Sequence, residues 1–328
     1  ADPRLRQLFA RYATYCGSSP WLAPATLMLI AQVEMDGVWS VEGGMVGMAQ
    51  ALARVARRRG AVFRYHSTCH RIEQRHGRVC GVHLQSGEYL PADRVIFNGD
   101  AQALRQGLLG ESVSQAVPKK PPERSLSALT WSMHAPVTDA ALDRHNVFFQ
   151  SDYASEFEDI FHHRRLPERP TVYVCAQDRP QGVLPGEAER LFCLVNAPAC
   201  GDDPQRTEEA TALCQERTFQ HLSDLGLKLT PTSSNSLRTT PQDFHQRFPA
   251  SGGALYGQAT HGWTSIFSRP GSNTPLPGLF LAGGSVHPGP GVPMAALSGQ
   301  RAAEALMASL ASTKTFQMGA TYGGTSML

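Results

Sequence analysis

Apolar residues recur at helical spacing along several stretches of the chain and predict amphipathic helices there. The first covers residues 2–15, and a second is expected to run from Pro20 through Ile30 with Ser19 as its N-cap. The strongest pattern covers residues 45–59. Four of its residues are expected to face the core: Met48, Leu52, Val55 and Ala56. Further helices are predicted at residues 100–109, 154–164 and 205–225, and from Val292 onwards.

Short apolar runs bounded by turn residues predict two groups of strands. The first group comprises residues 37–41, 61–65, 68–74, 78–84 and 94–98. The second comprises residues 126–134, 147–150, 171–176 and 191–197. Five aromatic residues belong to the second group: Trp131, Phe148, Phe149, Tyr173 and Phe192. These rings either line an apolar pocket or form an ordinary sheet core, and the core is the expected place for any single one of them.

Composition narrows the class of protein. The net charge of +2 over 328 residues gives no reason to expect a nucleic-acid partner. The seven cysteines are scattered without a C-x-x-C pair, which favours reduced thiols over disulfides or a zinc site, and no metal site is predicted. No apolar run approaches the roughly 20 residues that cross a bilayer, so any membrane contact is expected to be peripheral.

The most informative segment is a glycine-rich turn between a short apolar run and a helix. Residues 279–282 are apolar, four glycines follow, and the helix is predicted to start at Val292. The four glycines are Gly283, Gly284, Gly289 and Gly291. Glycine lets the backbone approach a ligand closely, and a helix N-terminus presents unpaired N–H groups. The pattern is compatible both with a cradle for a large cofactor and with an ordinary strand–loop–helix corner.

Residues 278–298 resemble the C-terminal signature of the bacterial carotenoid desaturases, the phytoene dehydrogenase family. The matching positions are Gly278, Phe280, Leu281, Gly283, Gly284, Ser285, His287, Pro288, Gly289, Gly291, Val292 and Ser298. Val286 and Pro290 depart from the usual small residues. Segments 15–25, 37–45, 79–100 and 248–271 match the same family in order. Residues 15–30 and 37–45 look most like the 1-hydroxycarotenoid 3,4-desaturases, also called methoxyneurosporene or hydroxyneurosporene dehydrogenases.

The resemblance implies an α/β (α+β) flavoprotein fold of the FAD/NAD(P)-binding type, with a second substrate lobe on a mixed sheet plus helices. Because the chain has no G-x-G-x-x-G, we expect it to be a C-terminal two-thirds fragment. The missing partner would be the N-terminal βαβ dinucleotide-binding segment, and the fragment alone would bind FAD weakly and be inactive. The expected division is 1–36 (helical part of the substrate or membrane lobe), 37–116 (cofactor portion), 117–245 (substrate lobe), 246–312 (cofactor portion) and 313–328 (mobile tail).

The function implied by the resemblance is FAD-dependent desaturation of an acyclic carotenoid by hydride transfer to flavin. The branch that matches best implies C-3,4 desaturation of 1-hydroxycarotenoids in spheroidene or spirilloxanthin biosynthesis. Alternatives are a phytoene desaturase or carotene isomerase or oxygenase on the same scaffold, a flavin amine oxidase-like enzyme, and a non-catalytic carotenoid- or lipid-binding fragment.

The same resemblance implies a cytoplasmic protein attached peripherally to the inner photosynthetic membrane. One helix either contacts that membrane or is buried in the core, through Trp21, Leu22, Leu27, Met28, Leu29 and Ile30.

The expected site residues follow from position in the resembling segments. Backbone N–H groups of four residues are expected to contact the flavin or its ribityl chain: Gly283, Gly284, Gly291 and Val292. The Cys69 backbone is expected at the adenine, and Asn98 and Asp100 near the nucleotide, with Asp100 also a candidate helix N-cap. His287 is the one titratable group of the signature. It either accepts a proton in catalysis or shapes the turn, and the second role is favoured.

Overall fold

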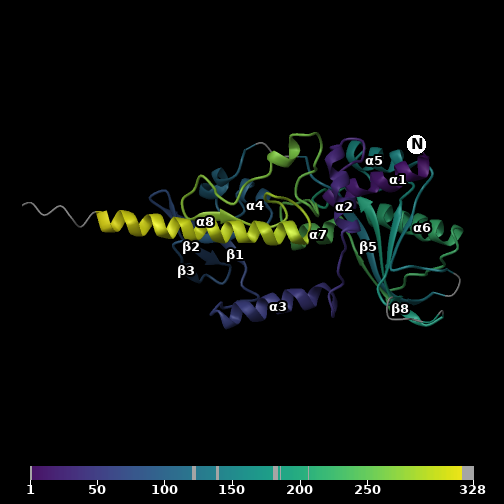
Figure 1. The fold of residues 1–328 in the computed structure, drawn as a ribbon, viewed down its shortest axis with the longest axis horizontal. Helices are drawn as coiled ribbons and strands as arrows, with labels where there is room; N and C mark the ends of the chain where they lie inside the picture. Colours follow the sequence, from purple (N-terminus) through teal and green to yellow (C-terminus); the bar gives the residue numbers. More distant parts are fainter. Residues whose placement is uncertain are drawn as a thin grey trace, which may run out of the picture.

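A computed structural model describes residues 2–119, 123–137, 140–179, 184, 186–205 and 207–319, without the side chains of residues 266 and 311–319. The molecule is elongated, with a large sheet at one end and the long helix α8 (Val292–Gly319) running along the other part (Figure 1). Helix α8 continues past residue 312, where the sequence analysis ended the C-terminal cofactor portion and expected a mobile tail to begin. Between that point and Gly319 the sequence holds no glycine or proline to stop a helix. Residues 320–328 of the expected mobile tail lie outside the described residues.

The large sheet has five strands in the order β6-β7-β8-β5-β9. Their bounds are β5 Ser127–Pro136, β6 His145–Phe148, β7 Val172–Ala176, β8 Ala188–Ala197 and β9 Ser236–Thr239. Every pairing in it is antiparallel, so the prediction of a mixed sheet was wrong. Strand β9 was not predicted, because it is short and only partly buried.

Helix α6 (Glu208–Asp224) closes the core of this sheet. The indole of Trp131 is fully buried, meets the Phe219 ring edge-on at 5.2 Å between centroids, and donates from Nε1 to Oε1 of Gln215 at 2.8 Å. Phe148 packs against the same core. These contacts place Trp131 and Phe148 in the sheet core, and neither of them lines the pockets described below, so for these two rings the pocket interpretation was wrong.

The other part of the molecule combines two small sheets. Strands β1 (Cys69–Arg75), β2 (Arg78–Leu84) and β3 (Tyr89–Pro91) form an antiparallel sheet. Strand β4 (Val95–Phe97) pairs in parallel with β10 (Leu279–Leu281). Their common core contains Ile72, Val79, Leu104, Leu279, Leu281 and Val286. The short helix α4 (Ala101–Arg105) follows β4 directly. Strand β3 is a further element that the sequence pattern did not predict.

The N-terminal helices depart most from the prediction. Helix α1 (Pro3–Ala10) continues as a 3-10 helix, but the second helix begins at Ala25, not at Pro20. Proline disfavours the helical conformation of the residue before it, so Pro24 prevents a helix that enters from Pro20. The Ser19 hydroxyl instead accepts the Trp21 N–H at 3.3 Å. Helix α2 (Leu29–Met35) completes this region.

Helix α3 (Gly44–Arg58) forms where it was predicted, yet its apolar face is exposed. Leu52 is 65% and Val55 is 55% exposed, and no residue of the helix is buried. In Figure 1 the helix lies apart from the small sheets. The burial expected for Leu52 and Val55 was therefore wrong, whereas Met48 and Ala56 are half-buried.

Two predicted strands do not form in the described structure. Residues 37–41 and 61–65 have no strand partner. Gly37 has a φ of +113°, which is incompatible with a regular strand, and Trp39 is 93% exposed.

Helix α5 (Tyr153–Phe157) continues into a π-helical turn, and α7 (Pro241–Arg247) is a short helix that the sequence pattern did not predict.

Truncation of a buried side chain of α6 tests the assigned core. Leu222→Ala should lower the free energy of unfolding by about 3 kcal/mol, because it leaves a cavity against the sheet. Leu213→Ala on the same helix is the matched control, since this side chain is 45% exposed and should change stability by less than about 0.5 kcal/mol. Urea denaturation followed by circular dichroism measures both, and equal losses would contradict the assigned core.

Candidate functional site

The glycine-rich turn lies against the segment that follows β4. Because β4 and β10 are parallel, the carboxyl ends of both strands meet at one edge, and the Ala282 N–H donates to the Phe97 carbonyl at 3.0 Å. Gly283 has a φ of +118°, and a Cβ there would lie 2.8 Å from Oδ1 of Asn98. Glycine is therefore required at this position by conformation and by space. Asn98 and Gly283, two of the predicted site residues, are neighbours.

Helix α8 holds the turn through Ser298. The Gly283 N–H donates to the Ser298 hydroxyl oxygen at 2.7 Å, and that fully buried hydroxyl in turn donates to the Ala295 carbonyl at 2.8 Å. In the described structure this N–H is therefore used within the chain, and its contact with a flavin stays a prediction. In contrast, the N–H groups of Gly284 and Gly291 have no acceptor among the described residues.

Open space lies beside those two glycines. A Cβ on Gly284 would find its nearest neighbour 4.0 Å away, and one on Gly291 would meet nothing within 4 Å. Val292, the first residue of α8, is half exposed. The N-terminal turn of α8 therefore presents free donors, and the positive end of its dipole, to the space next to the turn.

A pocket of about 430 Å³ borders the turn at Ser285. Its other lining residues are Asp100, Ala101, Gln102, Arg105, Pro118, Glu123, Gly257, Gln258, Ala259, His261, Thr264, Ser265, Ser268 and Pro270. We call it the turn pocket. The backbone of Gly257 approaches so closely that a Cβ there would lie 2.7 Å from the Ser285 Cβ. The turn therefore forms part of the wall of a real cavity.

Asp100 has the N-cap role that the sequence favoured. Its Oδ1 accepts the Gln102 N–H at 2.8 Å at the start of α4, and the residue also lines the turn pocket. Burial raises the pKa of this carboxyl, against the opposing effects of the Gln102 N–H and of Arg105. The carboxyl thus caps a helix and faces the cavity at the same time.

Arg269 is a functional candidate that sequence reasoning missed. Its buried guanidinium donates to three carbonyl oxygens, those of Tyr256 at 2.8 Å, Gln258 at 2.8 Å and Gly284 at 3.2 Å. No carboxylate among the described residues forms a salt bridge with it.

Burial lowers the pKa of Arg269 to about 10, so the group remains protonated at neutral pH. A buried positive charge without a carboxylate partner is costly, and an anionic or electron-rich ligand beside the turn would offset that cost. The sequence signal was the segment 268–271, in which an arginine stands next to proline and glycine close to the signature.

Of the predicted site residues Asp100 lines the turn pocket, and the others, His287 and Cys69 among them, lie outside its wall. The His287 N–H donates to the Pro270 carbonyl at 2.8 Å, which fits the turn-shaping role, and its ring is only partly buried. Cys69 begins β1 and packs partly against the core shared with Leu281. Burial raises the pKa of the Cys69 thiol, so the side chain behaves as a small apolar group. Its contact with adenine, and a proton-accepting role of His287, stay predictions.

Taken together, these features fit a large electron-rich cofactor such as FAD. Free N–H groups, glycines that leave space, and a buried unpaired guanidinium meet at one turn. Arg105 adds a positive group to the wall of the turn pocket, where burial lowers its pKa, whereas Arg269 lies behind that wall.

Comparison with known proteins places this site in a family. The family described as "Flavin containing amine oxidoreductase" matches residues 23–307, which include the turn and the pocket. The oxidoreductase from Methanosarcina mazei has a similar fold, with a TM-score of 0.55 at 17% identity over 92% of this chain and 64% of that chain. At this identity the likeness shows the fold alone, a flavoprotein oxidoreductase fold of mixed helices and sheets.

Curated relatives are more similar in sequence. Hydroxyneurosporene desaturase of Rubrivivax gelatinosus is 55% identical over 99% of this chain and 62% of its own length. The enzyme of the same name from Cereibacter sphaeroides is 47% identical over 95% of this chain and 62% of its length. The 1-hydroxycarotenoid 3,4-desaturase of a Flavobacterium species is 33% identical over 93% of this chain and 62% of its length. The resemblance to the carotenoid desaturases is confirmed, and the chain spans 62% of the length of these relatives.

A substitution at Gly283 tests the cradle. Gly283→Ala should raise the dissociation constant for FAD about tenfold or more, because the new Cβ meets Asn98 and the backbone is strained. Gly299→Ala within α8 is the control, since nothing lies within 4 Å of its added Cβ. It should leave flavin binding unchanged and stabilise the helix by up to about 1 kcal/mol. Quenching of flavin fluorescence in the protein that carries this chain gives the affinities, and equal affinities would argue against the cradle.

A second substitution tests the buried guanidinium. Arg269→Lys should lower the free energy of unfolding by about 1–3 kcal/mol, because an ammonium cannot reach three carbonyls set in the fork geometry of arginine. Arg4→Lys, with its side chain 88% exposed beside Asp2, serves as the control and should change stability by less than about 0.5 kcal/mol. Denaturant titration measures the free energy of unfolding of both variants. An unchanged value for Arg269→Lys would contradict the structural role assigned to this guanidinium.

Proposed function

Because the chain belongs to the family of flavin-containing amine oxidoreductases, we propose that the protein carrying it is an FAD-dependent desaturase of an acyclic carotenoid. The expected reaction is C-3,4 desaturation of a 1-hydroxycarotenoid. The observation that carries the proposal is the glycine turn, which opens on a cavity and lies in a chain 55% identical to hydroxyneurosporene desaturase of Rubrivivax gelatinosus over 327 residues.

The residues that would hold FAD are those with free donors or matching charge. The N–H groups of Gly284 and Gly291 and the first turn of α8 at Val292 would face the flavin. Asn98 and Asp100, which follow β4, would lie toward the nucleotide. Arg269 would keep the turn in place through the Gly284 carbonyl and add positive charge where electron density increases.

Desaturation removes two hydrogens from adjacent carbons of a hydrocarbon, one as a hydride and the other as a proton. When bound, FAD supplies the acceptor for the hydride and its two electrons. The protein must hold the carbon chain against that acceptor and exclude water, since a polyene offers almost nothing to hydrogen-bond. The proton leaves to a base or to water, and His287 stays the predicted candidate for a base.

A second cavity offers the apolar wall that such a substrate needs. A pocket of about 390 Å³, which we call the aromatic pocket, is lined by Trp21, Leu22, Phe157 and Phe161, with Ser19, Glu123, Ala154, Glu158 and His162. Its rings pack on one another, with Trp21 and Phe157 centroids 5.5 Å apart. This surface favours a hydrocarbon over the polar substrate of an amine oxidase.

The proposal includes peripheral attachment to the cytoplasmic face of the inner photosynthetic membrane. Trp21 is 55%, Leu22 51%, Met28 40% and Leu29 68% exposed, whereas Leu27 and Ile30 are half-buried, so four of the six predicted side chains lie on the surface and are available to a membrane. An exposed cluster of this kind is suited to the interfacial region of a bilayer. Within the described residues, no helix combines the length and apolar character that a membrane crossing requires.

Product analysis tests the proposed function. The protein that carries this chain should convert 1-hydroxyneurosporene to a product with a longer conjugated system, seen as a red-shifted absorption band, and should leave phytoene unchanged. Gly299→Ala is the control variant that should retain turnover. His287→Ala with normal turnover would exclude the base role. Conversion of phytoene, or oxidation of a primary amine without any change to the carotenoid, would replace the proposal by one of its alternatives.

A further inference from the structure

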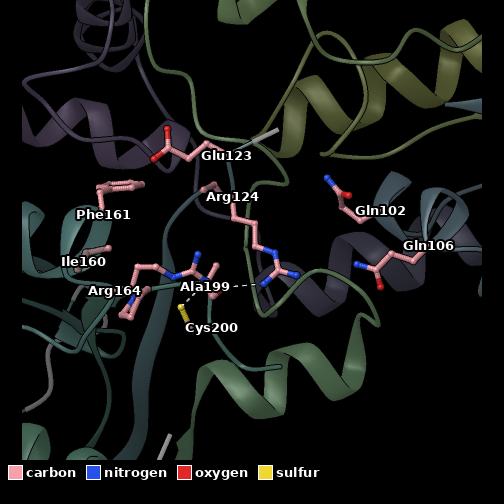
Figure 2. Close-up of a pocket in the computed structure, with 11 residues that line it drawn as sticks. Gln102, Gln106, Glu123, Arg124, Ile160, Phe161, Arg164, Ala199 and Cys200 are labelled. Atoms are coloured by element: carbon pink, nitrogen blue, oxygen red, sulfur yellow. Dashed lines mark hydrogen bonds between the residues drawn. The ribbon is translucent and has the colours of Figure 1, made fainter. Parts of the chain in front are cut away.

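Three cavities of the molecule meet at one side chain. A third pocket of about 280 Å³, shown in Figure 2, is lined by Arg124, Arg164 and Cys200 and shares lining residues with the turn pocket and with the aromatic pocket. Glu123 is the one described residue that lines all three. In Figure 2 its carboxylate lies on the same side of the pocket as Phe161, with Gln102 and Gln106 opposite.

We propose that Glu123 recognises a hydroxyl group near the reacting end of a hydrocarbon substrate and is thereby a specificity-determining residue. This inference rests on the proposed function, because it assumes that the carbon chain extends from the aromatic pocket to the turn pocket. It adds the residue that would distinguish a hydroxylated carotenoid from its parent hydrocarbon.

His261 fixes the position of the Glu123 carboxylate. The Ser19 N–H donates to Nε2 of His261 at 3.0 Å, which leaves the proton of a neutral ring on Nδ1. Nδ1 lies 2.8 Å from Oε2 of Glu123 and therefore donates to it. The imidazole also meets the Phe161 ring edge-on, with centroids 4.7 Å apart. The imidazole is thus held from three sides and orients the carboxylate.

The second oxygen of this carboxylate is available to a ligand. Among the described residues, Oε1 of Glu123 has no hydrogen-bond partner, and the side chain is 55% exposed. Arg124, the next residue, does not compete for it, because its guanidinium forms two hydrogen bonds with Asp202 at 2.6 and 2.8 Å. The hydrogen bond from His261 lowers the pKa of Glu123, so the group is an acceptor at neutral pH. A ligand group that pairs with it must therefore be a donor, as a hydroxyl is.

The position of Glu123 matches the chemistry of a 1-hydroxycarotenoid. In such a molecule the hydroxyl-bearing carbon lies only a short stretch of chain away from the C-3,4 bond. A residue that binds this hydroxyl must therefore lie near the glycine-rich turn, and Glu123 lines the same pocket as Ser285 of that turn. On its other side, Phe161 and Trp21 provide apolar surface for a hydrocarbon. An unsubstituted hydrocarbon end that displaced water from this half-exposed carboxylate would offer no donor in return, so its binding would cost free energy that a hydroxylated end avoids.

Binding measurements that do not depend on flavin chemistry test this assignment. Detergent-solubilised 1-hydroxyneurosporene and neurosporene are titrated into the protein that carries this chain, and quenching of tryptophan fluorescence reports the two affinities. The wild-type protein should prefer the hydroxylated ligand by about tenfold, the effect of one hydrogen bond to a charged group. Glu123→Leu should abolish the preference. Glu123→Gln retains an acceptor oxygen and should keep a preference of about threefold, and it serves where the leucine variant does not fold.

Glu216→Leu is the matched control, because Glu216 is exposed on α6, lines none of the three pockets and should leave the preference intact. Equal binding of both ligands by the wild-type protein, or an unchanged preference in Glu123→Leu and Glu123→Gln, would overturn the assignment. Product formation is measured separately on the same samples. A hydroxyl preference that depends on Glu123 without any desaturation would refute the proposed function while supporting this recognition site.

Discussion

The parallel pairing of β4 with β10 is the contact on which the candidate site depends. The two strands are far apart in the sequence, yet the Ala282 N–H donates to the Phe97 carbonyl and aligns their carboxyl ends. Each strand is followed by a polar or glycine-rich segment and then by a helix, α4 or α8. The pairing therefore places two helix N-termini and the segments before them at one edge, where a cofactor can be held by backbone donors.

Buried polar contacts keep this edge in a single arrangement. Ser298 of α8 accepts the Gly283 N–H, and Arg269 donates to the Gly284 carbonyl of the same turn. Arg269 also donates to Tyr256 and Gln258, so one guanidinium ties the turn to the strand-like segment that lines the turn pocket. The cost of burying its charge is offset only in part by these neutral carbonyls. This imbalance explains why the site is suited to a ligand with negative or developing negative charge.

Predictions from the sequence were confirmed where interactions between residues close together in the chain decide the structure. The N-cap at Asp100, the helix at α3 and the hairpin between β1 and β2 depend on neighbouring residues, and all three formed. Local patterns failed where a partner was required. Residues 37–41 alternate like a strand but have no strand beside them, and the apolar face of α3 is exposed because no described element covers it. The second helix started late because Pro24 outweighs an otherwise helical pattern.

The sequence by itself determined the family and the place of the turn. Glycines at fixed spacing can be recognised along one segment, without knowledge of which other segments pack against it. Only the tertiary structure decided what each group of that turn does. It assigned the Gly283 N–H to Ser298, brought Arg269 beneath the turn, and placed Trp131 in a sheet core. It also put Glu123 in the walls of three pockets and brought His261, which is far from it in the chain, within hydrogen-bond distance of its carboxylate. Hydrogen-bond partners and cavity walls are set by the packing of distant segments, and no pattern along a single segment contains that information.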